Sequence, residues 1–268
     1  MSNEQPIGIF DSGVGGLTVA HAVSDLLPEE QLIYFGDSAH LPYGDKSAAT
    51  IQAYSIKICD VLLERGCKII LIACNSASSA AFELIKAYVG SKAEVLNVID
   101  PVVDYVADHF SNKKVGLIGT KQTIGSGVYD YQIKVIDSSI TIGALATPLL
   151  VPMIEEGFHN DNISKAIISE YLKSNQLEGI MGLILGCTHY PLIKKEIQEH
   201  LNPNTEVIDS ALIVAKALQA FLLENDLSNL KRKGNNEFIV SDITPSFQKA
   251  ASHFFGSKIE LSQHKLWE

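Results

Sequence analysis

The sequence predicts an α/β fold in which parallel strands alternate with helices. Residues 69–74 and 182–187 are each an apolar run that ends in a cysteine and precedes helix-like sequence. Such runs are typical of strands that are buried on both faces of a parallel sheet. Strand-like and helix-like stretches also alternate along most of the chain, which is the pattern of βαβ units. Both observations favour parallel sheets flanked by helices.

The first part of the chain carries one such series. The predicted strands are residues 7–10, 32–35 and 68–73, and the predicted helices are residues 17–27 and a stretch from about residue 46 that includes residues 51–64. Residues 11–16 form a glycine-rich loop that could hold an anion on its free N–H groups or could be a simple tight turn. The loop lacks both the spacing of a dinucleotide fingerprint and the lysine of a phosphate loop, so it does not identify a ligand alone.

A second series follows residues 97–101, where we predict a domain boundary. The predicted strands are residues 114–119, 141–144, 180–186 and 206–208, with a short helix at residues 148–157 and a long one at residues 211–224. An exposed linker at residues 231–236, a strand at 237–241 and a helix at 245–255 would then return the chain to the first domain. The predicted domains are therefore residues 1–98 with 210–268, and residues 99–209.

Composition and charge narrow the class of function. The chain has 268 residues, of which 46% are apolar, and a formal net charge of −10. An acidic chain is poorly suited to nucleic acid or anionic membranes, since both attract basic surfaces. We see neither a signal-peptide pattern nor an apolar run long enough to span a bilayer. The expectation is a cytoplasmic protein that binds a small-molecule substrate, with no nucleic-acid or membrane partner.

The four cysteines divide into two kinds. Cys59 and Cys67 are predicted core thiols, and the absence of paired spacing argues against a disulfide framework. Cys74 and Cys187 each stand at the carboxyl end of a predicted strand. Ligands of open α/β sheets bind at that edge, so two thiols on separate strands could face one pocket.

Polar residues at the same sheet edge are further candidates. Asp11 ends the first strand beside a glycine turn, which suits a cleft better than a core. Asn75 and Ser76 could cap a helix or contact a ligand. The loop at residues 40–45 lies at this edge too, and Glu155 is either a site residue or a solvated acid before a glycine.

Four interpretations of the two strand-end thiols remain open at this point. Zinc would lack a fourth ligand beside Cys74, Cys187 and His189. Nucleophilic catalysis would leave one cysteine unused, offers no oxyanion motif, and needs a base where we expect His189 to be badly oriented. Two buried inert thiols are the third interpretation. The fourth uses both thiols, because a thiol pKa of about 8.5 lets one remove a proton from a carbon while the other returns a proton to the opposite face.

Four blocks of sequence, in order, resemble the signatures of the glutamate racemases, within the aspartate/glutamate racemase family. The blocks are residues 11–17 (DSGVGGL), 42–44 (PYG), 73–75 (ACN) and 186–192 (GCTHYPL). This resemblance implies two pseudo-symmetric α/β domains with the active site in the cleft between them. It also implies a cofactor-independent isomerase that makes D-glutamate for peptidoglycan and cell-wall biogenesis. The incomplete set of zinc ligands predicts that the activity needs no metal either. The resemblance is compatible with a homodimer but does not determine the oligomeric state.

The resemblance also implies roles for individual residues. Cys74 would deprotonate D-glutamate and Cys187 L-glutamate, with Asp11 and His189 assisting their respective thiols and Glu155 near His189. The implied substrate-binding residues are Asp11, Ser12, Pro42, Tyr43, Gly44, Asn75, Ser76, Thr120, Thr123, Thr188 and His189.

One departure and two alternatives accompany the resemblance. Ser76 stands where the family usually has threonine. Serine keeps the hydroxyl group but lacks a methyl group, so the difference should affect substrate affinity or the range of substrates rather than the mechanism. A racemase of aspartate or of a hydantoin is the nearest alternative. A non-catalytic two-lobed amino-acid-binding protein is another, although a binder has no need of two strand-end thiols.

Overall fold

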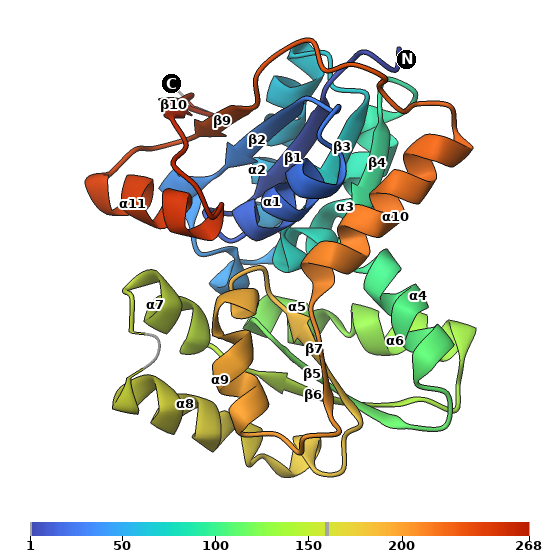
Figure 1. Cartoon of the computed structure of the whole chain (residues 1–268), viewed down its shortest axis with the longest axis vertical. Helices are drawn as coiled ribbons and strands as arrows, with labels where there is room; N and C mark the ends of the chain where they lie inside the picture. Colours follow the sequence, from blue (N-terminus) through green and yellow to red (C-terminus); the bar gives the residue numbers. More distant parts are fainter. Residues whose placement is uncertain (1, 159–160, 268) are drawn as a thin grey trace.

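The computed structural model describes residues 2–158 and 161–267, and it confirms the predicted fold class. Two sheets made of parallel strands lie one above the other along the long axis of the molecule, each with helices on both faces (Figure 1). We propose that the sheets mark two domains, residues 1–98 with 210–268 and residues 99–209.

The first sheet has six strands in the order β10-β9-β2-β1-β3-β4. Their bounds are β1 Ile7–Asp11, β2 Leu32–Gly36, β3 Ile69–Ile72, β4 Glu94–Asn97, β9 Glu237–Val240 and β10 Leu261–Gln263. The strands β1, β2 and β3 are buried along their whole length, as their continuous apolar sequence predicts. The late strand β9 pairs with β2, so the chain returns to its first sheet as expected.

Five helices cover the two faces of this sheet. They are α1 Leu17–Leu26, α2 Ala48–Glu64, α3 Asn75–Val89, α10 Ser210–Glu224 and α11 Pro245–Phe254. Side chains of α1, α10 and α11 share one apolar core with alternate strand residues such as Ile9 and Leu71. Side chains of α2 and α3 pack on the opposite face, against residues such as Phe10 and Ile72. The alternation of strand side chains thus feeds two separate cores.

The second sheet has four strands in the order β6-β5-β7-β8. Its elements are β5 Lys114–Gly119, β6 Thr141–Ala146, β7 Gly182–Gly186 and β8 Glu206–Ile208, with helices α4 Asp100–His109, α5 Lys121–Ser126, α6 Val128–Ile136, α7 Leu150–Glu155, α8 Asn162–Leu172 and α9 Lys194–Glu199. Residues of α4 and α6 form a core on one face. On the other face, residues of α7, α8 and α9 join the core that also contains α1 and α10. One apolar core therefore extends across both sheets.

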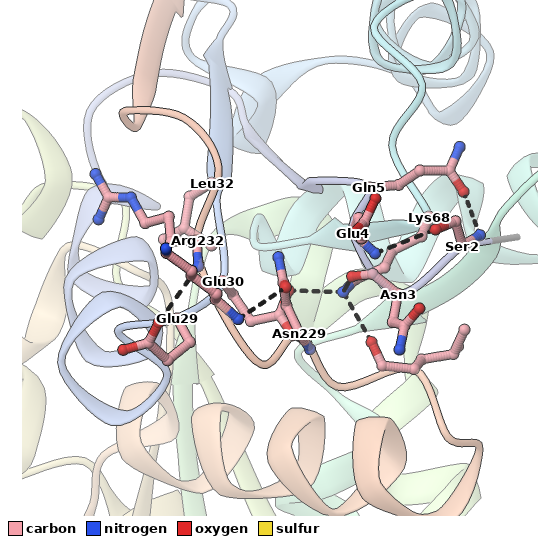
Figure 2. Close-up of polar contacts among 12 residues, drawn as sticks. Ser2, Asn3, Glu4, Gln5, Glu29, Glu30, Leu32, Lys68, Asn229 and Arg232 are labelled. Atoms are coloured by element: carbon pink, nitrogen blue, oxygen red, sulfur yellow. Dashed lines mark hydrogen bonds and ion pairs between the residues drawn. The ribbon is translucent and has the colours of Figure 1, made fainter.

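A buried lysine ties three distant segments together at the end of the first sheet where β3 begins (Figure 2). The Lys68 ammonium is fully buried, so it needs acceptors for its protons. It donates to the Asn3 carbonyl oxygen at 2.6 Å, to Glu30 Oε2 at 2.7 Å and to the Leu227 carbonyl oxygen at 2.8 Å. Glu30 Oε1 in turn accepts from the backbone N–H of Asn229 at 2.7 Å. This cluster fixes the segment that leads from α10 toward β9.

Candidate active site

The residues that follow the carboxyl ends of strands in both sheets line one cavity of about 210 Å³. That volume lies below the range of about 300–1,000 Å³ for drug-sized ligand sites and suits a small metabolite. The sequence-predicted residues on its wall are Ser12, Pro42, Tyr43, Gly44, Cys74, Asn75, Ser76, Thr120, Glu155, Cys187, Thr188 and His189. Two other predicted residues, Asp11 and Thr123, are buried behind this wall and contact residues on it. The cavity therefore unites nearly all of the predicted site.

Cys74 precedes the first turn of α3 and caps it. Its Sγ accepts a hydrogen bond from the backbone N–H of Ala77 at 3.4 Å. Of the two alternatives for Asn75 and Ser76, capping is wrong, because both lie inside the helix and line the cavity. The thiol donates to Ser12 Oγ at 3.6 Å. Burial, and then the negative charge of Asp11, raise the pKa of Cys74 to about 12. At neutral pH this residue is a thiol that can give up a proton to a strong base.

Cys187 stands beside a charged histidine. His189 Nδ1 lies 3.7 Å from Cys187 Sγ, and its Nε2 lies 2.8 Å from Glu155 Oε1. Burial disfavours the imidazolium, but the hydrogen bonds with Cys187 and Glu155 outweigh it and raise the pKa of His189 to about 10. Both ring nitrogens then carry protons at neutral pH, so the imidazolium can donate to a sulfur anion on one side and to a carboxylate on the other.

The expectation that His189 would be badly oriented is wrong. The strand β7 ends at Gly186, and His189 has helical dihedral angles (φ −79°, ψ −30°) at the start of the 3-10 helix Tyr190–Ile193. The alternation of faces along a strand therefore does not extend to His189. On its other side, the His189 ring packs edge-on against Phe254 of α11, with 5.2 Å between the ring centroids.

Asp11 lies between the two halves of the site. Its Oδ2 accepts from the backbone N–H of Gly13 at 3.0 Å, and its Oδ1 accepts from Thr188 Oγ1 at 3.4 Å. Complete burial raises the pKa of this carboxyl group, and the nearby charge of His189 partly offsets the effect. Asp11 thus places negative charge where it influences Cys74 without lining the cavity.

The glycine-rich loop allows close approach of the two halves. A Cβ atom at Gly15 would lie 2.3 Å from Thr188 Oγ1, and one at Gly16 would lie 2.5 Å from the Cβ of Asp11. Neither distance is compatible with a side chain. The loop therefore brings β1 and α1 against the segment that follows β7, which adds a second role to the turn that the sequence predicts.

Hydroxyl and amide groups form another part of the cavity wall. Ser76 Oγ lies 2.8 Å from Thr120 Oγ1, and Thr120 Oγ1 donates to Thr123 Oγ1 at 3.1 Å. Asn75 Oδ1 accepts from Tyr129 OH at 2.7 Å, but the buried Asn75 Nδ2 has no partner among the described residues. A buried amide N–H normally has an acceptor, so this group is suited to a ligand oxygen such as that of a carboxylate.

The cavity wall also contains residues that the sequence analysis did not name as candidates. Gly13, Leu41 and Asp45 belong to the two loops predicted at the ligand edge, whereas the others were not predicted at the site: Lys121, Thr147, Pro148, Val151 and Pro152. Behind the wall, the fully buried Asp37 accepts from Tyr43 OH at 2.6 Å and from Ser241 Oγ at 2.7 Å. Asp37 thereby orients the tyrosine. Its position directly after β2 is a signal that could have identified it, since Asp11 ends the neighbouring strand β1 at the same edge of the sheet.

Two further observations concern metals and membranes. Within residues 2–158 and 161–267, no group of three or more His, Cys, Asp or Glu side chains is arranged to hold a metal ion. None of the helices in those ranges has the length and apolar character needed to cross a bilayer.

Comparison with known proteins agrees with the geometry. The Asp/Glu/Hydantoin racemase family matches residues 17–218. The chain belongs to this family and is an isomerase. Several relatives that span nearly its whole length are glutamate racemases. The enzyme of Geobacter metallireducens is 38% identical over 254 residues, which cover 94% of this chain and 93% of that one.

Solved structures show the same relationship. Glutamate racemase of Francisella tularensis, crystallised in complex with D-glutamate, is 37% identical, covers 98% of each chain and superimposes with a TM-score of 0.92. The Thermus thermophilus enzyme, in complex with β-chloro-D-alanine, is 36% identical, covers 99% of each chain and has a TM-score of 0.89.

Proposed function

We propose that this chain interconverts L- and D-glutamate by a two-base mechanism that uses Cys74 and Cys187 and no cofactor. The observation that carries the proposal is the placement of two thiols, from two separate sheets, on the wall of one small cavity. Their surroundings differ, because Cys74 lies near a buried carboxyl group and Cys187 lies beside an imidazolium. The glutamate racemases among the relatives support glutamate as the substrate.

The direction of the reaction assigns the roles of the two thiols. In the L to D direction, the Cys187 thiolate forms an S–H bond with the α-proton of L-glutamate as the C–H bond breaks. The Cys74 thiol then loses its proton to the opposite face of the α-carbon, which forms the C–H bond of D-glutamate. The imidazolium of His189, 3.7 Å from Cys187 Sγ, can donate a hydrogen bond to the starting thiolate. In the reverse direction Cys74 is the base and Cys187 the acid.

The polar wall of the cavity suits the two carboxylates of glutamate. Asn75 Nδ2 can donate to a carboxylate oxygen as it stands, and the hydroxyl groups of Ser76, Thr120 and Thr188 can donate when they turn from their present acceptors to a bound substrate. Ser12, Pro42, Tyr43 and Gly44 complete the wall on the side of the first sheet. The product is D-glutamate, and we propose that it supplies peptidoglycan synthesis in the cytoplasm.

Racemisation in deuterated water tests the two-base mechanism. The purified protein is incubated with L-glutamate, without pyridoxal phosphate or added metal, and optical rotation and deuterium content are followed. Two bases that serve opposite faces place solvent deuterium in the first D-glutamate formed, while the remaining L-glutamate stays largely unlabelled. Early labelling of both enantiomers would indicate a single base, and absence of racemisation would refute the proposed function.

Substitution of each cysteine tests the assignment of faces. Cys74→Ser and Cys187→Ser should each nearly abolish racemisation in both directions, because serine is a poor base at neutral pH and each direction needs one base and one acid. A substrate analogue with a β leaving group needs only the abstracting thiol. Cys187→Ser should therefore still eliminate from the D-analogue, and Cys74→Ser from the L-analogue. Elimination from the same enantiomer by both variants would contradict the assignment.

Alkylation provides an independent test on the unmodified protein. Both thiols line the cavity, so a thiol reagent should inactivate the enzyme and either enantiomer of glutamate should protect it. Cys59 and Cys67 are buried outside the cavity and serve as internal controls in peptide mapping. Full turnover by protein that is alkylated at Cys74 and Cys187 would rule out the two-thiol mechanism.

A further inference from the structure

An ion pair joins the two halves of the molecule at the mouth of the cavity. Lys121 Nζ lies 3.1 Å from Asp45 Oδ1, and both residues line the cavity. Asp45 ends the 3-10 helix Tyr43–Asp45, which follows β2 of the first sheet. Lys121 is the first residue of α5, which follows β5 of the second sheet. The pair therefore spans the entrance between residues that belong to different sheets.

The backbone beside this ion pair is held closely on both sides. A Cβ atom at Gly44 would lie 2.7 Å from the Cβ of Thr120, so the two segments pack against each other without space for a side chain. Ser76 Oγ lies 2.8 Å from Thr120 Oγ1, which adds a hydrogen bond between the halves at the same place. Asp45 directly follows Gly44 in the sequence, and Lys121 directly follows Thr120. The attachment points of the Asp45 and Lys121 side chains are therefore well defined.

Lys121 is more available to an anion than His189, the other cation on the described part of the cavity wall. Among the described residues on the cavity wall, the cations are Lys121 and the imidazolium of His189. Both ring nitrogens of His189 are already engaged, by Cys187 and Glu155. The ammonium group of Lys121 has only Asp45 as an ion-pair partner in the described structure, and its side chain is 61% exposed. Of these two cations, Lys121 is the one open to an anion from solvent.

The carboxylate of Asp45 can be replaced in its ion pair with Lys121 by another carboxylate. Ion pairs between exposed side chains contribute little net stability, because water screens the charges and both side chains lose freedom. The side chain of Asp45 is 58% exposed, so a carboxylate of similar charge can replace it at low cost. The chain carries a net charge of −10, and a local ammonium group offsets the repulsion that an anionic substrate meets.

We propose that Lys121 determines specificity for amino acids with a second carboxylate, by exchanging Asp45 for the distal carboxylate of the substrate. This inference rests on the proposed racemisation of glutamate, and it concerns which substrates enter and bind rather than the proton transfers. Asp45 holds the ammonium group at the mouth until the substrate arrives. Removal of Asp45 should therefore leave Lys121 freer to bind substrate.

Steady-state kinetics of Lys121→Gln test the proposal. The KM for both enantiomers of glutamate should rise about fivefold at low ionic strength, with kcat changed by less than about twofold, because the lost contact forms on binding. Glutamine, tested as a competitive inhibitor, lacks the distal charge and should bind equally to both proteins. Asp45→Asn should lower the KM for glutamate. An unchanged KM, or equal weakening of glutamate and glutamine, would overturn the proposal.

Two further variants separate a specificity role from a structural one. The charge-swapped Asp45→Lys/Lys121→Asp protein keeps an ion pair across the mouth but moves the ammonium group to the other wall, so its KM should stay high. Recovery of the wild-type KM by this variant would show that the pair only holds the halves together. Lys134→Gln removes an exposed pair with Asp130 on α6, outside the cavity, and should leave KM unchanged.

Direct binding distinguishes failure of this inference from failure of the proposed function. Calorimetric titration with glutamate measures affinity whether or not the protein turns it over. Absence of racemisation by the wild-type protein would refute the proposed function, whereas equal glutamate affinity of wild type and Lys121→Gln would refute the specificity role alone.

Discussion

Replacement of Glu155 by glutamine should move the alkaline limb of the pH–rate profile. The proposed L to D step needs the imidazolium of His189 beside Cys187, so the rate falls when His189 loses its proton. The pKa of His189 is about 10, raised by its hydrogen bonds with Cys187 and Glu155 against the effect of burial. Glutamine keeps the shape of the side chain and a hydrogen-bond acceptor but removes the negative charge. The proton on His189 is then held less tightly.

The size of the shift follows from the contact that changes. His189 Nε2 and Glu155 Oε1 are 2.8 Å apart, and the histidine is buried. A hydrogen bond to a charged group contributes about 1.5–3 kcal/mol, roughly twice the value for a neutral pair. Loss of the charge-assisted part therefore costs on the order of 1–2 kcal/mol, which corresponds to about one pH unit. The alkaline limb should move from near pH 10 in the wild type to about pH 9.

Circular dichroism of glutamate measures the rate from pH 6 to 11 in both directions. The enantiomers have equal free energy in water, so kcat/KM must be equal for L- and D-glutamate at every pH, which provides an internal check. Glu156→Gln is the matched control, since Glu156 is the exposed neighbour at the end of the same helix. An alkaline limb that stays near pH 10 in Glu155→Gln, or that moves equally in Glu156→Gln, would refute the reasoning.

Four other outcomes are expected. Asp11→Asn should lower kcat but keep or raise the melting temperature, because burial disfavours the charge of this carboxyl group and raises its pKa. The raised pKa of His189 stabilises the fold fully below about pH 6.5, and this contribution should disappear as the pH rises through about 10, as chemical denaturation at several pH values can show. Lys68→Met leaves Glu30 buried and unpaired, so denaturant titration should show a loss of about 3–5 kcal/mol. Dialysis against a chelator should not reduce activity, and a loss restored by metal would contradict the metal-independent mechanism.

The sequence predicts those parts of the fold whose pattern is local and strong. The strands β1, β2, β3, β5, β7 and β9 are apolar runs, and their predicted bounds lie within two residues of the observed ones. The strand β4 reads EVLN and was not predicted, because its apolar run is only two residues long and it lies at the edge of the sheet. The helices α4, α6 and α8 were missed as well. Their acidic or mixed sequences bury only a few residues each, so packing rather than local pattern determines them.

The candidate site was predictable where its residues follow strands. Cys74 and Cys187 are found by position alone, since each ends an apolar run. Thr147 and Lys121 were missed, because nothing in the sequence shows which side chains near a strand end turn toward the cavity. The orientation of His189 depends on a helical turn directly after β7, which the strand pattern does not reveal. Long-range pairs such as Asp45 with Lys121 need the packing of two sheets before they exist.

The late return of β9 has a consequence for synthesis of the chain. The second sheet is built from one continuous stretch, residues 114–208, whereas the first sheet is completed only by strands from residues 237–263. Until the ribosome has released β9, the buried apolar strand β2 is an open edge, and such edges invite pairing between chains. A nascent or truncated chain that ends before residue 237 should therefore aggregate although it contains both cysteines. Solubility of this protein during translation depends on residues 237–263 reaching the strand β2, which is synthesised about 200 residues earlier.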